Sequence, residues 1–223
     1  MRIKKTLLIG QLPPPRHGMS SAFEVLVNGF REKDISITVL DASPGKHSRK
    51  KGGISFVRLL QSFIYLLKAF CLIPIHENIY LIVAITRIGF LKDFPILIWA
   101  SFFKKHIIVH MHSGGFGDFY QNECPFIMKL IRYSYSRISD LVILDPSFEI
   151  QFSDFFGKGL QIHVVENCIP NNVDEGFSEQ KSIDGECVNI LYLSNLFETK
   201  GYLDVLEAVR ILTHEYGQDV KAH

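Results

Sequence analysis

Short apolar runs alternate with longer amphipathic segments along the chain. The runs are rich in β-branched and aliphatic residues on consecutive positions, which is typical of strands covered on both faces. In chain order, six such runs are KTLLIG, ISITVLD, NIYLIVAI, HIIVHMH, DLVILD and QIHVVEN. Strands that alternate with helices predict βαβ units. We therefore expect an α/β fold with a doubly wound, parallel, Rossmann-like sheet.

The segments between the runs have helical spacing of apolar residues. Residues 20–34 predict a helix with Ser20 or Ser21 as its N-cap. Residues 56–70 predict a second helix, whose apolar stripe we expect to face the core. That stripe consists of Phe56, Leu59, Leu60, Phe63, Leu67 and Phe70. Further helices are expected over residues 91–103 with a bend or start at Pro95, over 124–139 and over 146–156.

The composition and the spacing of apolar residues change after the sixth run. Residues 1–168 predict an N-terminal Rossmann-like domain, and residues 169–187, rich in Pro, Asn, Gly, Ser and acidic residues, predict a linker. Residues 188–223 predict the first βα unit of a second Rossmann-like domain. Because one βα unit cannot bury its own sheet faces, either it docks on the first domain or the chain is a fragment of a longer two-domain protein. We favour the fragment.

Composition narrows the class of protein. Hydrophobic residues make up 47% of the 223 residues, which indicates a globular chain with a substantial core, and a net charge of +1 gives no basic field for nucleic acid. The four cysteines are far apart without a CxxC pair, which is typical of a reduced cytoplasmic chain. The N-terminal segment does not have the apolar region and cleavage site that a signal peptide needs, so we expect none, and no uncharged apolar run approaches the ~18–20 residues of a membrane span. We expect a cytoplasmic protein that is soluble or peripheral on a membrane.

The segment QLPPPRHGMS follows the first strand, and candidate substrate-binding residues in it are Arg16, His17, Gly18 and Met19. Its prolines fix the direction of the chain. Gly18 allows backbone N–H groups to approach an anion at the start of the helix. The alternative is a rigid strand–helix connector that binds no ligand.

The segment HMHSGGFGDFY follows the fourth strand. His110 and His112 lie two residues apart on an extended segment, so their side chains point to the same face. We expect His110 to be a packed, hydrogen-bonded core residue. His112 is the candidate catalytic residue, because it is nearer the strand end and could donate a hydrogen bond to a substrate hydroxyl or phosphate. Gly114 and Gly115 leave room for a close ligand. A zinc site would need a third ligand, so no metal is expected.

The segment SNLFETKGYLDVL contains the third candidate. Lys200 comes just before a predicted helix, so its ammonium group can project over the helix N-terminus where an anion would bind. Asn195, at the end of the preceding strand, could share that site.

These features, in this order, resemble glycosyltransferases of the GT-B fold, and in particular the large family 4 of nucleotide-sugar-dependent retaining enzymes. The resemblance includes the loop with Gly18, the strand that ends at His112 and the element VVENCI with Asn167. It also includes LSNLFETKGYLDVLEA, which is similar to the pattern vGRLxxxKGxxxLxxA that opens the second domain of the family. The resemblance covers nearly all of the chain.

The resemblance implies transfer of a sugar from a nucleotide-diphosphate sugar to a glycan or lipid-linked acceptor, with retention of configuration and without a metal or other cofactor. The backbone at Gly18 would approach the donor, His112 would contact the transferred sugar, and Lys200 would neutralise the diphosphate. Asn167 would also contact substrate.

Four departures from the family pattern bear on activity. Met19 replaces a second glycine, Asn195 replaces the arginine that partners the lysine, and Cys168 replaces the glycine after Asn167. The Glu-x7-Glu motif of the family has no counterpart, so we expect these 223 residues to be inactive by themselves.

The stretch from Ala42 to His76 has no acidic residue. Its basic residues are Lys46, Arg49, Lys50, Lys51, Arg58 and Lys68. Basic residues beside an aromatic-rich helix suit anionic lipid headgroups, so residues 46–68 predict contact with an anionic membrane surface. The alternative is a merely solvated polar face. A function from another class is a non-catalytic subunit that binds acceptor and membrane and pairs with a separate donor-binding chain.

Overall fold

The computed structural model describes residues 5–43, 56–152, 160–167, 187–193 and 200–222, and side chains are described for all of these except 56–58, 187 and 222. The chain divides into two compact units, residues 1–170 and 171–223, and each is described by itself. The expected linker lies outside the described residues, apart from Cys187, which begins a strand.

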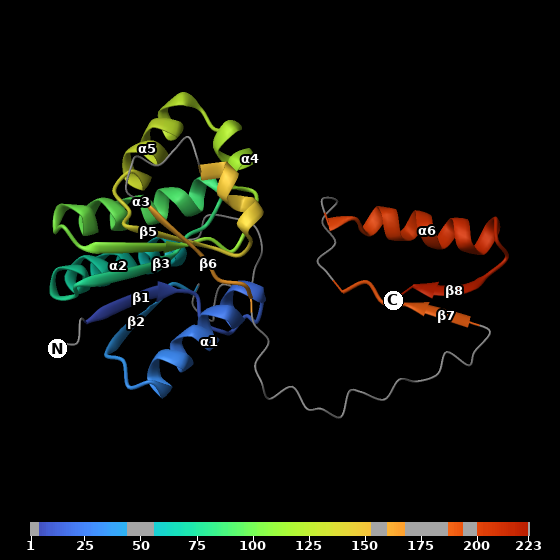
Figure 1. Ribbon diagram of the computed structural model, residues 1–223, viewed down its shortest axis with the longest axis horizontal. Helices are drawn as coiled ribbons and strands as arrows, with labels where there is room; N and C mark the ends of the chain where they lie inside the picture. Colours follow the sequence, from blue (N-terminus) through green and yellow to red (C-terminus); the bar gives the residue numbers. More distant parts are fainter. Residues whose placement is uncertain (1–4, 44–55, 153–159, 168–186, 194–199, 223) are drawn as a thin grey trace. The chain divides into compact units, whose positions relative to one another are not determined.

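The first unit is an α/β domain with a six-stranded parallel sheet flanked by helices (Figure 1). Its strands are β1 (Thr6–Gly10), β2 (Ile37–Asp41), β3 (Asn78–Ile82), β4 (His106–His110), β5 (Asp140–Ile143) and β6 (Gln161–Val164). Their order in the sheet is β2-β1-β3-β4-β5-β6, and every neighbouring pair is parallel. All six apolar runs form strands, so the predicted Rossmann-like parallel arrangement is confirmed.

Helices cover both faces of this sheet. They are α1 (Gly18–Glu32), α2 (Phe56–Leu72), α3 (Arg87–Phe102), α4 (Phe116–Gln121) and α5 (Pro125–Tyr135), with short 3-10 helices η1 (Ile73–Ile75) and η2 (Pro146–Phe152). Side chains alternate between faces along a strand. Leu8 of β1 therefore packs with Phe23 and Val27 of α1, whereas Leu7 and Ile9 pack in the larger core with residues of α2, α3 and α5.

Four of the six residues of the α2 stripe do not face the core, which corrects our expectation. Phe70 is half-buried beside Trp99, and the side chain of Phe56 is not described. Ala69 is buried and Leu72 packs against the core, and at 3.6 residues per turn both lie far from the centre of the stripe, whereas Leu66 packs against the core from the edge of the stripe. Large exposed apolar side chains on α2 are Leu59, Leu60, Phe63, Ile64 and Leu67. Periodicity locates such a stripe but does not reveal whether a sheet or another surface covers it.

Three expectations about helices differ from the structure in detail. Helix α3 begins at Arg87, with Thr86 as its N-cap, and Pro95 lies inside it although proline removes one helical hydrogen bond. The N-cap of α1 is His17, and neither Ser20 nor Ser21. The segment from Pro146 forms a 3-10 helix, and its end beyond Phe152 lies outside the described residues. Helix α4 was not expected.

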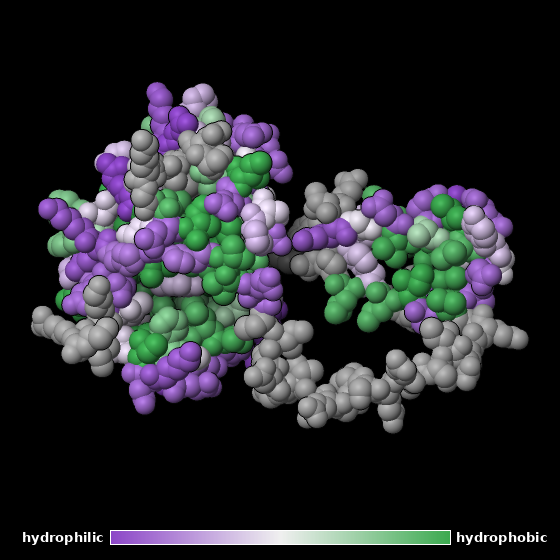
Figure 2. All heavy atoms as spheres, viewed as in Figure 1, coloured by the Kyte–Doolittle hydropathy of each residue, from purple (hydrophilic) through white to green (hydrophobic). Residues whose placement is uncertain are grey.

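The second unit contains β7 (Cys187–Ile190), α6 (Tyr202–His214) and β8 (Asp219–Ala222), with β7 and β8 parallel. The expected single βα unit is therefore a βαβ unit, since a second strand follows the helix. No residue of α6 is buried, and Leu206 is 55% exposed. Figure 2 shows hydrophobic residues gathered at the surface of this unit.

A substitution at Gly10, the last residue of β1, tests how α1 packs on the sheet. A Cβ at Gly10 would lie 2.8 Å from Cδ2 of the fully buried Phe23. We expect Gly10→Ala to lower the free energy of unfolding, measured with urea, by about 1–3 kcal/mol, because the core would be overpacked. Gly29→Ala is the control, since open space surrounds Gly29 inside α1 and alanine should stabilise the helix by about 0.5–1 kcal/mol. Equal effects of the two substitutions would contradict this packing.

Candidate functional site

The carboxyl ends of all six parallel strands meet at one edge of the sheet. The strand order reverses at β1, because β2 pairs with one edge of β1 and β3, the next strand in the chain, pairs with the other. In open α/β sheets, ligands bind beside such a reversal, outside the carboxyl ends of the strands. The loops with Gly18, His112 and Asn167 follow β1, β4 and β6, so the fold brings them to this edge.

A histidine pair lies at the end of β4. The rings of His110 and His112 have their centroids 4.0 Å apart. His110 is only 7% exposed, and its Nδ1 shares a short hydrogen bond with the Tyr80 hydroxyl of β3, so it is a packed core histidine as expected. His112 is half-buried and hydrogen-bonds the side chain of Asn167. Two residues far apart in the sequence are thereby joined at the sheet edge.

One nitrogen of each histidine lacks a hydrogen-bond partner in the described part of the chain. These atoms are Nε2 of His110 and Nε2 of His112, and both are buried. A buried polar atom left unsatisfied costs about 1–3 kcal/mol, so a ligand group that reached Nε2 of His112 would offset that cost.

Burial keeps both imidazoles neutral at pH 7. Desolvation lowers the pKa of His110 to about 3, helped by the charge that His112 would carry. Desolvation also lowers the pKa of His112, while its hydrogen bond to Asn167 works in the opposite direction. A neutral imidazole can accept or donate one hydrogen bond without placing a fixed positive charge beside the ligand.

The loop after β1 is organised by a capping box. Nδ1 of His17 accepts a hydrogen bond from the Ser20 amide at 3.3 Å, and Oγ of Ser20 accepts one from the His17 amide at 3.0 Å. His17 thus has a structural role that sequence reasoning missed. The amides of Gly18 and Met19 have no such partner among the described residues, and a Cβ at Gly18 would meet open space. This helix N-terminus can accept an anion.

Two other candidates in that loop make contacts within the protein. The Met19 side chain packs partly buried against the core around Phe23. The guanidinium of Arg16 is exposed and lies 3.5 Å from the carboxylate of Glu24, a surface ion pair of the kind that contributes little to stability.

The two glycines after His112 lie close to other side chains. A Cβ at Gly114 would come within 2.5 Å of the Phe148 ring, so this glycine allows the close approach of η2. A Cβ at Gly115 would lie 3.3 Å from Cδ1 of Ile85.

The remaining candidates belong to the second unit. Lys200 is exposed just before α6, and its carbonyl accepts a hydrogen bond from the Tyr192 hydroxyl. Gly201 is the N-cap of α6 with a φ of 79°, a left-handed conformation that explains the Lys-Gly pair structurally. Asn195 lies outside the described residues.

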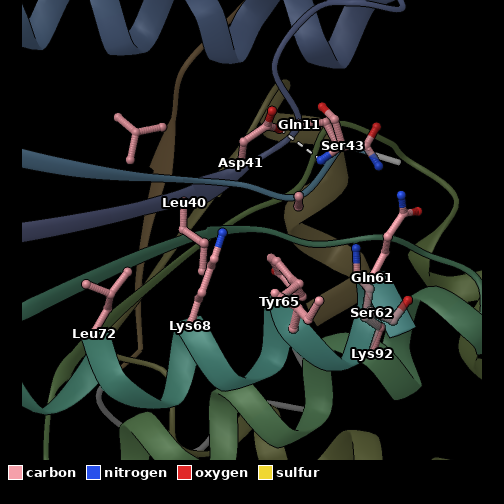
Figure 3. A pocket seen from close by; sticks show the side chains of 13 residues that line it. Gln11, Leu40, Asp41, Ser43, Gln61, Ser62, Tyr65, Lys68, Leu72 and Lys92 are labelled. Atoms are coloured by element: carbon pink, nitrogen blue, oxygen red, sulfur yellow. Dashed lines mark hydrogen bonds between the residues drawn. The ribbon is translucent and has the colours of Figure 1, made fainter. Parts of the chain in front are cut away.

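Sequence reasoning also missed a cavity of about 740 Å³ between β2 and helices α2 and α3 (Figure 3). We call it the β2–α2 cavity. Its polar lining consists of Gln11, Asp41, Ser43, Gln61, Ser62, Tyr65, Lys68 and Lys92. These residues come from the loop after β1, the end of β2, and two helices, so no local motif identifies them.

Comparison of the sequence with models of known protein families gives no match, and a search among curated proteins gives none either. Within the described residues, no three histidine, cysteine or acidic side chains are grouped as metal ligands would be. Nor is any helix of those residues both long and apolar enough to cross a bilayer.

The buried imidazole of His110 makes stability depend on pH. The unfolded chain binds a proton near pH 6.5 and the folded chain near pH 3, so stability is complete above pH 6.5 and is lost as the pH falls toward 3. Between pH 7 and pH 5 we expect the wild type to lose about 2 kcal/mol more than His110→Gln.

Urea unfolding of both proteins at the two pH values measures this difference. The carboxyl of Asp93, whose pKa burial raises to about 6, shifts stability in the opposite direction, but it does so in both proteins. Parallel pH profiles would show that folding does not change the pKa of His110.

Proposed function

We propose that this chain carries the N-terminal domain, with the doubly wound GT-B topology, and the start of the donor-binding domain of a glycosyltransferase. The enzyme transfers a sugar from a nucleotide-diphosphate sugar to a glycan or lipid-linked saccharide, with retention of configuration. The observation that carries the proposal is His112. It lies at the carboxyl edge of a parallel sheet, is kept neutral by burial and has Nε2 without a partner among the described residues.

The chemistry of the transfer fits the groups at this edge. The leaving nucleotide diphosphate gains negative charge, so it needs N–H and cationic donors. The amides of Gly18 and Met19, which have no partner among the described residues, suit a phosphate or a sugar hydroxyl. The resemblance assigns the diphosphate to Lys200. His112 would hydrogen-bond the transferred sugar near its reacting carbon, and Asn167 would hold the imidazole in one orientation. No metal or other cofactor takes part in the proposed mechanism.

Transfer activity tests the role of His112. The assay uses the protein expressed from the complete reading frame. In it, we expect His112→Ala to lower kcat/KM at least tenfold, a loss of about 1.4 kcal/mol in transition-state stabilisation. The measurement is release of nucleoside diphosphate from a panel of nucleotide sugars with an acceptor. His214→Ala, in the last turn of α6, is the matched control and should keep full activity. Unchanged activity in His112→Ala would reject the assignment.

A non-catalytic subunit that binds acceptor and membrane is the alternative. It would have the same first domain, but donor binding would reside on a separate chain. A frame that continues through a further domain with two glutamates eight residues apart favours the enzyme. A neighbouring frame that encodes the donor-binding half, with transfer only after the two chains are mixed, favours the subunit.

We propose further that the protein works at the cytoplasmic face of a membrane and that α2 contacts anionic lipid. The outward face of α2 supports this, because Leu59, Leu60, Phe63 and Leu67 are exposed on it, Phe63 to 58%, whereas the exposed Ile64 lines the β2–α2 cavity. They lie in the stretch between Ala42 and His76, which has six basic residues and no acidic one. An apolar helix face with flanking cations suits an anionic bilayer. The basic loop 46–51 lies outside the described residues.

The end of α3 extends the apolar surface beyond α2. Trp99 stacks on Phe102 with ring centroids 5.6 Å apart, and its indole donates a hydrogen bond to the carbonyl of Phe70 at the end of α2. Phe102 is 71% exposed, and Lys104 follows it closely. Aromatic side chains bordered by lysines are typical of surfaces that lie at the membrane–water interface.

Vesicle flotation tests the contact with lipid. We expect the chain to float with vesicles of anionic phosphatidylglycerol at low salt and to float weakly with neutral phosphatidylcholine. Leu60→Ser with Phe63→Ser should reduce flotation at least tenfold, since each buried side chain contributes about 1.5–3 kcal/mol. Ile88→Ser removes an apolar side chain that is 84% exposed at the start of α3 and is the matched control. Absence of flotation on anionic vesicles at low salt would remove the proposal.

A further inference from the structure

The β2–α2 cavity has an excess of positive charge. Lys68 and Lys92 both line it, and neither forms an ion pair with a carboxylate of the described residues. Asp41 also lines it, but its Oδ1 already accepts hydrogen bonds from the amides of Leu12 at 3.1 Å and Ser43 at 2.8 Å. In Figure 3, Lys68 and Lys92 extend from the helices toward the strand end that carries Asp41.

One residue of the lining also has a neutral polar group that lacks a partner. The hydroxyl of Tyr65 is buried without a hydrogen-bond partner among the described residues. Burial raises the pKa of this phenol, with a further contribution from the nearby carboxylates of Asp93 and Asp41, so it stays protonated and can donate. Leaving it unsatisfied is costly, and a ligand hydroxyl would remove that cost.

Further uncharged polar side chains line the same space. Gln11, Gln61 and Ser62 add amide and hydroxyl groups that can both donate and accept. They suit a molecule with several hydroxyl groups. Among the described lining residues, Tyr65 is the one aromatic side chain, and the ammonium group of Lys92 lies 5.2 Å from its ring centroid. That face is therefore occupied and does not offer a stacking platform for a nucleobase.

We propose that the β2–α2 cavity binds a saccharide ring that carries a phosphate or a carboxylate. Lys68 and Lys92 bind the anionic group, and Tyr65 with Gln61 binds ring hydroxyls. A volume of about 740 Å³ is within the range of small-molecule sites. The role of this saccharide as the acceptor rests on the glycosyltransferase proposal, whereas its binding does not.

Isothermal titration of the full chain, without donor, tests the cavity. The probes are glucose 6-phosphate, glucuronate, glucose and inorganic phosphate. We expect at least one of the two anionic sugars to bind about tenfold more tightly than both glucose and inorganic phosphate, because charge and hydroxyls are recognised together. The preferred sugar distinguishes a phosphate from a carboxylate.

Variants locate the binding. Lys68→Met and Lys92→Met should each weaken the preferred anionic sugar about tenfold. Tyr65→Phe should weaken it about threefold and leave inorganic phosphate unchanged, because only a ring hydroxyl loses its partner. Lys129→Met, which removes an exposed lysine of α5, is the matched control and should change nothing. Should Lys92→Met fail to fold, the exposed Lys68 still gives the test.

Three results would overturn the proposal. They are no binding of either anionic sugar at about 10 mM, inorganic phosphate binding as tightly as the sugars, and an equal loss in Lys129→Met. The outcome is separable from that of the transfer assay. Binding of an anionic sugar without sugar transfer would reject the glycosyltransferase proposal and support the cavity proposal. Sugar transfer without binding of an anionic sugar would reject the cavity proposal alone.

Discussion

The parallel pairing of β1 to β6 is the constraint on which the site depends. Parallel strands need crossover connections, so each of their carboxyl ends opens into a loop at the same edge. Strands β1 and β5 are buried along their whole length, which fixes their register because a shift by one residue would exchange the two faces. That rigid edge holds Gly18, His112 and Asn167 in place although they are far apart in the sequence.

The histidine pair shows how burial sets the chemistry of this edge. A charged imidazole would have to be desolvated beside a second imidazole, and the Tyr80 hydroxyl cannot neutralise it. Both rings are therefore neutral. A neutral His112 fits a hydrogen bond to a sugar hydroxyl better than a salt bridge to the diphosphate. In the proposed function, the positive charge that a diphosphate requires must then come from a group other than His112.

The sequence predicts the sheet well because apolar runs buried on both faces leave a strong local pattern, as in β1 and β4. It also predicts that His110 and His112 share a face. It does not predict how α2 is oriented, because an apolar stripe looks the same whether it packs on a sheet or faces outward. His17 was missed as an N-cap because histidine rarely fills that position. The cavity residues Tyr65 and Lys92 meet only through tertiary packing.

The orientation of α2 connects the two proposed ligands. Its polar side chains Tyr65 and Lys68 line the β2–α2 cavity, while Leu60 and Phe63 are exposed on the outward face. An α-helix with its side chains is about 10 Å thick, so the cavity would lie within one helix diameter of a bilayer bound to the outward face. A lipid-linked saccharide spans such a boundary, with its chain in the bilayer and its charged sugar in the aqueous layer. Turning α2 to bury its stripe would remove the proposed lipid contact and the cavity lining together.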